Sequence, residues 1–376
     1  MTRALIITIT AIISMCVLLA DSVSSHPAWG IVVDRNNQIY FSDLETIWKI
    51  DALGKLTVFR AGVSGRHIHE LAIDEGGNLY GADYSYESET QHYINAIWKM
   101  MPAGGFTYIL SPTNSLPRGM SIWRDRAGNM YSVEQNNHLK RETLLLRRTP
   151  SGNVSVLAGS SYGHADGKGS QAKFSSIVGM AFGPDGSLYL VDSSSIRKVT
   201  MDGAVTTLVR NVMVENASGN SVGGSSLFGI AVDAQGNAFV ADYGNRRILK
   251  IAPNGQLTTL IRSEESWFPT GVAARGGEIY ILEEAHTPSY TPIGTRIRKL
   301  SSDGKILVLA TVGENTNPPA STTPISTNIE SSVVVPKEFS SYWLVGIGAS
   351  VFALSIVVWR IRRKKSVELS ERKTHI

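Results

Sequence analysis

The sequence predicts an all-β protein, a six-bladed β-propeller of four-stranded antiparallel blades, with one transmembrane α-helix near the C-terminus. Three observations support this fold class. A phrase of four short apolar runs separated by turn residues occurs six times, apolar and polar residues alternate within the runs, and an uncharged stretch of eighteen residues comes late in the chain. One four-stranded sheet cannot bury both faces alone, whereas six sheets packed around an axis can.

The expected order along the chain has five parts. They are a signal peptide at 1–25, a propeller at 26–312, a stalk rich in Pro, Ser and Thr at 313–341, a transmembrane helix at 342–359 and a basic cytoplasmic tail at 360–376.

The N-terminal segment has the pattern of an export signal. Arg3 precedes an apolar run, Ala4 to Ala20, and small residues then lead to a cleavage position before His26. The alternative is an uncleaved anchor. The single cysteine of the chain, Cys16, lies in this segment, so a disulfide framework is excluded.

The six phrases share glycines at corresponding positions as well as their apolar pattern. Their first runs begin at Gly30, Glu70, Gly119, Gly179, Gly229 and Gly271. Four residues after each third run comes a glycine, which permits the positive φ of a hairpin turn. A β-sandwich also uses short strands at this spacing, but it does not require the same phrase six times. A helical solenoid is excluded because the period inside the runs is two.

The phrases resemble NHL repeats over about residues 30–310. The match is most specific at Ala165-Asp166-Gly167-Lys168-Gly169 and at Ala241-Asp242-Tyr243-Gly244-Asn245-Arg246-Arg247. The first two blades look more like the gluconolactonase and senescence-marker-protein group of propellers. The first resemblance implies an interaction scaffold. The second implies a hydrolase with a divalent ion held by carboxylates and amides from several blades.

Residues 342–359 are long enough to cross a bilayer as a helix. Trp343 and Trp359 stand at its two ends, and Arg360 begins a basic cluster that holds the following side in the cytoplasm. The predicted location is therefore the cell membrane, single-pass, with the propeller outside. A sorting enzyme that cuts before the helix is the alternative.

The charge distribution excludes nucleic acid as a partner. Residues 26–341 hold 28 basic and 29 acidic residues, and the net charge of +4 comes from the tail. The expected partners are the membrane, through the C-terminal helix, and an extracellular protein, glycan or small molecule.

The two ends of the predicted ring differ. One, the short-link end, carries the short links between first and second strands and between third and fourth strands. The other, the long-loop end, carries the remaining links, and long loops on a rigid base are where function usually lies. All six histidines between residues 30 and 310 fall there. The candidate ligand-binding residues are His67, His69, Glu70, Asp83, Tyr86, His92 and Trp267.

Glu70 stands where the other five blades have glycine, so something local requires a carboxylate. Glu70 and His69 are candidate metal ligands or an acid and base. The structural alternative is a glutamate that only pins its own loop. The acidic residue that ends every second run is interpreted as structural, because all six blades have it. His67 and His69 would share one side of an extended segment.

No catalytic motif of the serine-hydrolase, phosphate-loop, zinc-protease or dinucleotide type is present. The sequence therefore favours a membrane-anchored binding or interaction scaffold without catalytic residues. The alternative is a metal-dependent hydrolase or lactonase with a divalent ion near Glu70. Whether a cofactor is present is unknown.

Overall fold

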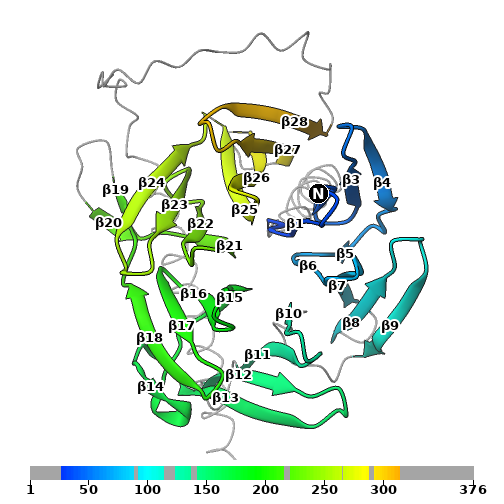
Figure 1. Cartoon of the computed structure of the whole chain (residues 1–376). Coiled ribbons are helices and arrows are strands. Elements are labelled where there is room, and N and C mark those ends of the chain that lie inside the picture. Colours follow the sequence, from blue (N-terminus) through cyan, green and yellow to red (C-terminus); the bar gives the residue numbers. More distant parts are fainter. Residues whose placement is uncertain are drawn as a thin grey trace, which may run out of the picture. The chain divides into compact units, whose positions relative to one another are not determined.

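The computed structural model describes residues 27–88, 92–113, 123–136, 142–215, 221–264, 266–287 and 292–313. The chain divides into two units, residues 1–320 and 321–376, and every described residue belongs to the first. Within the described residues, six antiparallel sheets follow one another around a central axis (Figure 1). The predicted six-bladed propeller is confirmed.

Each blade contains four strands that run outward from the axis in chain order. Blade 1 contains β1(Ile31–Val33), β2(Ile39–Ser42), β3(Ile47–Ile50) and β4(Leu56–Arg60). Blade 2 contains β6(Leu71–Ile73), β7(Leu79–Glu87), β8(His92–Met100) and β9(Phe106–Thr113). Blade 3 contains β10(Trp123–Arg124), β11(Met130–Asn136), β12(Glu142–Arg148) and β13(Val154–Ser161). Blade 4 contains β15(Ile177–Phe182), β16(Leu188–Asp192), β17(Ser195–Val199) and β18(Ala204–Val209). Blade 5 contains β21(Leu227–Val232), β22(Ala238–Asp242), β23(Arg247–Ile251) and β24(Leu257–Arg262). Blade 6 contains β25(Trp267–Arg275), β26(Glu278–His286), β27(Pro292–Leu300) and β28(Ile306–Val312).

Four short strands and one helical turn supplement the blades. Strand β5(Arg66–His67) pairs with β7, β14(Gly167–Lys168) extends blade 4 outside β18, and β19(Met213–Glu215) forms a hairpin with β20(Ser221–Gly224). The 3-10 helix η1(Gly169–Gln171) follows β14.

The short-link end is built from tight, self-satisfied turns. In the link between β6 and β7, Asp74 accepts hydrogen bonds from the backbone N–H of Asn78 (2.9 Å) and from its side-chain Nδ2 (2.8 Å). The links between third and fourth strands turn on glycine with φ near +85°, as at Gly54 (φ 82) and Gly104 (φ 90). These are the turns that the spacing predicts.

The core lies between neighbouring blades. Ile31 and Phe41 of blade 1 are buried against Tyr280 and Leu282 of blade 6. The ring thus closes by side-chain packing between its first and last blades. Blade 1 supplies all four of its own strands and blade 6 all four of its own, so no strand is shared between them.

Glycine lets the inner strands approach closely at the long-loop end. A Cβ on Gly229 would lie 2.8 Å from the Cα of Gly271, and one on Gly271 would lie 2.5 Å from the carbonyl oxygen of Trp29. Both contacts are shorter than real Cβ contacts, so these positions cannot hold a side chain without movement. This packing explains why the first runs of blades 5 and 6 begin with glycine.

The long links are partly strand, which corrects one expectation. Strands β7 and β8 pair from Leu79↔Met100 to Glu87↔His92, so Tyr84, Tyr86 and His92 lie on a long hairpin. The period of two simply continues through Tyr84-Ser85-Tyr86. The predicted signal peptide, transmembrane helix and tail, and the stalk beyond Gly313, lie outside the described residues. Among the residues that are described, no helix has the length and apolar character needed to cross a bilayer.

Candidate functional site

The segment Pro27–Trp29, just before β1, organises the long-loop end. The Trp29 ring stacks on His69 of blade 2 at 5.1 Å between centroids and on Phe228 of blade 5 at 5.7 Å. Its backbone N–H donates to the carbonyl oxygen of His69 (2.9 Å). Trp29 therefore reaches across the inner strands from blade 2 to blade 5.

Glu70 is held by the same tryptophan. The indole Nε1 of Trp29 donates to Oε1 of Glu70 at 3.0 Å. Glu70 is half-buried immediately before β6, and this hydrogen bond holds its carboxylate against the indole of Trp29. The sequence predicts a carboxylate with a local purpose here, and this contact supplies one structural purpose.

The two histidines of blade 2 lie together. The rings of His67 and His69 meet edge to face with 5.9 Å between centroids, as their spacing in an extended segment predicts. Nδ1 of His69 is 3.3 Å from the carbonyl oxygen of Pro27, to which it donates in the tautomer that carries a proton there. Tyr84 continues the contact, with its ring centroid 6.3 Å from that of His69.

These rings belong to a longer series, here called the aromatic row. Its members, in order from blade 2 to blade 6, are Tyr93, Tyr84, His69, Trp29, Phe228, Tyr243, Phe268 and His286. Each adjacent pair is in ring contact, at centroid distances of 4.8 to 6.3 Å. Tyr86 joins at the blade 2 end through Tyr93 (5.1 Å). Most of these side chains are half-buried, so the row presents ring surface at the long-loop end.

The blade 6 end of the row holds a buried acid. Glu284 accepts from the backbone N–H of Ala28 (2.9 Å) and lies 3.5 Å from Nε2 of His286. Both side chains are buried. The hydrogen bond from Ala28 connects the segment Pro27–Trp29 to blade 6 as well as to blade 2.

Asp83 lies apart from this cluster and is buried in the wall between blades 1 and 2. Arg60 of β4 donates to both of its oxygens, at 2.6 and 2.7 Å, and Nε1 of Trp98 donates at 2.8 Å. These partners give Asp83 a structural task. Its predicted role in ligand binding stays a prediction.

Two other predicted residues are also outside the cluster. The side chain of His92 is exposed at the start of β8, opposite Glu87. Trp267 lies on β25, where its ring packs under the guanidinium of Arg296 at 4.2 Å. The structure thus brings together His67, His69 and Glu70, with Tyr86 at the far end of the row.

The acids that end the second strands brace the blades, as their repetition predicts. Asp43 accepts from the backbone N–H of Thr46 (2.8 Å), and Asp242 accepts from Arg247 (2.7 Å) and from the Ser225 hydroxyl. Asp192 likewise pairs with the buried Arg197, and Glu283 pairs with the buried Arg296 and Arg298. Carboxylates used in this way are structural.

The residues that sequence reasoning missed are Trp29, Phe228 and Glu284. Trp29 and Phe228 stand immediately before the first-strand glycine of their blades, and His69 stands immediately before Glu70. The same register position thus places three rings at the mouth. Comparing that position across the six phrases could have found them.

A family model described as SMP-30/gluconolactonase/LRE-like region matches residues 30–281. No curated protein sequence matches significantly.

Similar solved structures include virginiamycin B lyase from Staphylococcus aureus, with 17% identity, a TM-score of 0.47, and coverage of 75% of this chain and 83% of that chain. A gluconolactonase from Xanthomonas campestris has 16% identity and a TM-score of 0.47, with coverage of 68% and 83%. A calcium-binding regucalcin from Agrobacterium tumefaciens has 15% identity and a TM-score of 0.47, with coverage of 70% and 83%.

The gluconolactonase resemblance implies a divalent ion at the long-loop end. The described residues contain no group of three or more His, Cys, Asp or Glu side chains placed to hold a metal ion. At the register position of His69 the other described blades carry Trp29, Val178, Phe228 and Thr270. Of these only the threonine hydroxyl offers a weak oxygen donor, so the described residues do not complete such a site, and no step is assigned to a metal. His69 and Glu70 as ligands stay a prediction.

Proposed function

We propose, since the chain belongs to the SMP-30/gluconolactonase/LRE-like family, that it is a hydrolase of small cyclic or simple esters acting at its long-loop end. The family match over residues 30–281 carries this proposal. It favours the hydrolase of the two functions considered from the sequence, with the binding scaffold second.

The long-loop end has the groups that ester hydrolysis needs. Attack of water on an ester carbonyl requires a base that takes a proton from the water and an acid that protonates the leaving oxygen. His69 and Glu70 supply an imidazole and a carboxylate on one side of Trp29, which contacts both. The half-buried rings beside them offer a surface on which a substrate ring can lie.

The first experiment measures turnover by the purified full-length chain. The substrates are glucono-1,5-lactone, the aromatic lactone dihydrocoumarin and p-nitrophenyl acetate, each against its spontaneous hydrolysis. We expect turnover of at least one. Loss of that turnover on dialysis against EDTA, and its return with a divalent ion, would support His69 and Glu70 as metal ligands. No turnover above background on any of the three would contradict the hydrolase.

The scaffold remains the second candidate because of the aromatic row. Eight rings in continuous contact across blades 2, 1, 5 and 6 resemble a stacking platform more than a closed catalytic pocket. Binding of a glycan or peptide without turnover would support this candidate.

We propose further that the propeller is displayed outside the cell on the helix at 342–359. The uncharged stretch and the basic residues that follow it support this topology. Removal of the signal would also remove Cys16 and leave no thiol. Labelling of a single introduced cysteine therefore shows on which side of the membrane that residue lies. A membrane-impermeant maleimide should label Ser151→Cys in intact cells and spare Ser366→Cys. The reverse labelling would contradict the topology.

A further inference from the structure

The hairpin that joins β12 to β13 carries the sequence Asn153-Val154-Ser155 at the short-link end. Asparagine followed by any residue except proline, and then by serine or threonine, is the acceptor sequence for N-linked glycosylation of exported proteins. The chain contains one other such sequence, at 216–218, which lies outside the described residues. Asn153 is therefore the acceptor that the structure describes.

The backbone of this hairpin is held without the side chain of Asn153. The N–H of Thr149 donates to the carbonyl oxygen of Asn153 (2.9 Å), and the N–H of Asn153 donates to the Thr149 hydroxyl (3.1 Å). Nδ2 of Asn153 has one partner among the described residues, the hydroxyl of Ser151 at 3.5 Å. A sugar on Nδ2 would therefore break no backbone hydrogen bond.

The turn itself does not require asparagine at this position. The glycine before it has φ between 82 and 92° in all six blades. At the position of Asn153 the other blades carry Lys55, Gly105, Ala204, Gln256 and Lys305. Since the same turn forms around all of these residues, its geometry does not account for the asparagine of blade 3.

The surroundings of Asn153 leave room for a large substituent. Asn153 immediately precedes β13, which is the outermost strand of blade 3 (Figure 1). Among the described strands β13 pairs with β12 alone, so its outer edge is open. Asn153, Val154 and Ser155 are all exposed. An oligosaccharide can thus extend outward without meeting a neighbouring blade.

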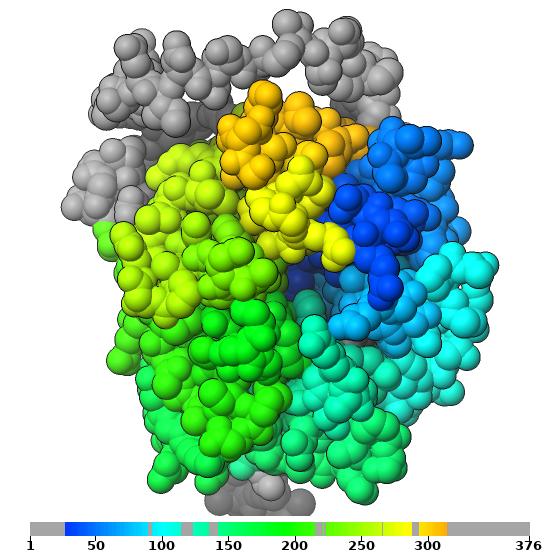
Figure 2. Space-filling view, viewed as in Figure 1, coloured from blue at the N-terminus to red at the C-terminus, as the bar shows by residue number. Residues whose placement is uncertain are grey.

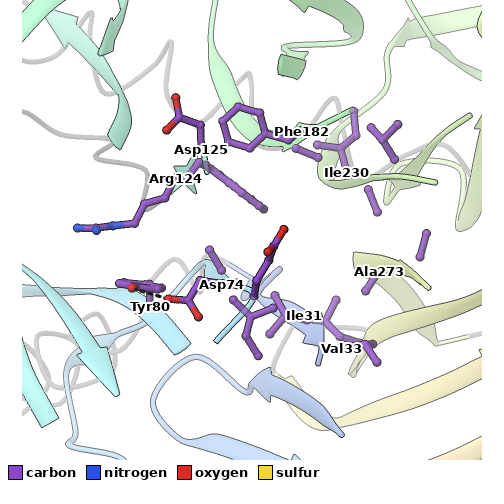
Figure 3. A pocket seen from close by; sticks show the side chains of 18 of the residues that line it. Ile31, Val33, Asp74, Tyr80, Arg124, Asp125, Phe182, Ile230 and Ala273 are labelled. Carbon is purple, nitrogen blue, oxygen red and sulfur yellow. Dashed lines mark hydrogen bonds between the residues drawn. The ribbon is translucent and has the colours of Figure 1, made fainter. Parts of the chain in front are cut away.

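The position also keeps a sugar away from the axis of the ring. The axis holds a cavity of about 620 Å³ at the short-link end, lined by all six inner strands, with Ile31, Phe182 and Ala273 among the residues that face it (Figure 3). Figure 2 shows the hollow near the centre, where the colours of the blades meet. Asn153 does not line this cavity, and three strands of its own blade separate it from the axis.

We propose that Asn153 is an N-glycosylation site, modified during export of the chain. Its Nδ2 attacks C1 of an oligosaccharide carried on a polyprenyl diphosphate. A C–N bond forms, the bond from C1 to the phosphate oxygen breaks, the polyprenyl diphosphate leaves, and the amide loses one proton. The inference rests on the exported topology proposed above and is independent of the hydrolase. The glycan stands at the outer margin of blade 3 and leaves the long-loop end open.

Mass spectrometry of the full-length chain produced in insect cells tests the proposal. Peptide N-glycosidase converts a glycosylated asparagine to aspartate, so digestion in water enriched in the heavy oxygen isotope labels each site. We expect the label at position 153. Ser155→Ala should lower the labelled fraction there at least tenfold. Ser155→Thr should retain it, because threonine supplies the same hydroxyl.

A matched position in blade 5 separates the site from the topology. Gln256 is followed by Leu257 and Thr258, and all three are exposed after an equivalent glycine turn. Gln256→Asn completes the same acceptor sequence and should gain a label. A label in Gln256→Asn with none at Asn153 overturns the proposal alone, and no label at either position contradicts the exported topology with it. An undiminished label in Ser155→Ala also overturns the proposal, because it would arise from deamidation without a sugar.

Discussion

At the scale of single residues, each buried carboxylate in the described part of the propeller accepts hydrogen bonds from defined donors. Asp83 is the clearest case, since its buried oxygens accept hydrogen bonds from the two terminal nitrogens of Arg60 in the neighbouring blade. Removing one partner of a buried pair leaves a charge in a poorly solvated place. The exposed pair of Lys168 and Asp202, at 2.7 Å, has the same chemistry without the burial.

Arg60→Met should therefore lower the free energy of unfolding by about 3 kcal/mol. Lys168→Met, the matched exposed variant, should change it by no more than about 0.5 kcal/mol. Urea unfolding followed by tryptophan fluorescence measures both. Equal effects of the two substitutions would show that Asp83 is not braced by Arg60.

At the scale of elements, one buried arginine holds the link between blades 3 and 4 in place. Arg197 of β17 is fully buried and donates to Asp192 (2.8 Å), to Asp166 (2.8 Å) and to the carbonyl oxygen of Ala165 (2.8 Å). His164 lies in the same link, with Nε2 3.3 Å from the Thr207 hydroxyl. Burial, and then the positive charge of Arg197, lower the pKa of His164.

This lowered pKa gives a pH dependence of stability with a definite sign. The unfolded chain binds a proton at the ordinary histidine value of about 6.5, whereas the folded chain binds it only at lower pH. Stability should therefore fall as the pH decreases through about 6.5. Urea midpoints at pH 7.5 and 5.5 should differ less in His164→Gln than in the parent chain. An equal difference in both would contradict the assignment.

At the scale of the whole molecule, the ring closes without a shared strand, and Pro27–Trp29 ties its first blade to its neighbours. Ala28 donates to Glu284 of blade 6, and Trp29 contacts blades 2 and 5. The junction between blades 1 and 6 otherwise depends on side-chain packing, as between Phe41 and Leu282. We therefore expect this junction to be the first place where the ring opens.

Hydrogen exchange measured by mass spectrometry tests this closure. Glu284→Ala removes the acceptor of Ala28, so it should accelerate exchange in β1 to β4 and in β25 to β28, and should leave β15 to β18 unchanged. Those last strands form blade 4, on the far side of the ring (Figure 1). Uniform acceleration in all six blades would mean that Glu284 supports the fold as a whole and not the junction.

Much of the architecture could be predicted from the sequence because it is repeated. The period of two fixes the strands, and glycines such as Gly54 and Gly104 fix the turns. The structural use of Asp43 and Asp242 followed from their recurrence in every blade. The neighbourhood of His67, His69 and Glu70 followed from their closeness in the chain.

The rest depends on contacts between distant residues. Nothing local in the sequence shows that Trp29 stacks on Phe228, 199 positions later in the chain, or that Asp83 takes Arg60. The cavity was missed because its walls come from six blades, and each blade shows only an ordinary apolar inner strand. The family match likewise shifts the functional weight from the scaffold toward the hydrolase, which the motifs alone had placed second.

The most direct test of the hydrolase at the long-loop end is a comparison of two isosteric substitutions. Steady-state turnover of the substrate that the full-length chain hydrolyses best is measured for Glu70→Gln and for Glu278→Gln, whose carboxylate pairs with Lys299 at the short-link end. Loss of an acid or base group should lower kcat/KM by about 10²-fold or more in Glu70→Gln, while Glu278→Gln stays within twofold of the parent chain. Full activity in folded Glu70→Gln would contradict the account.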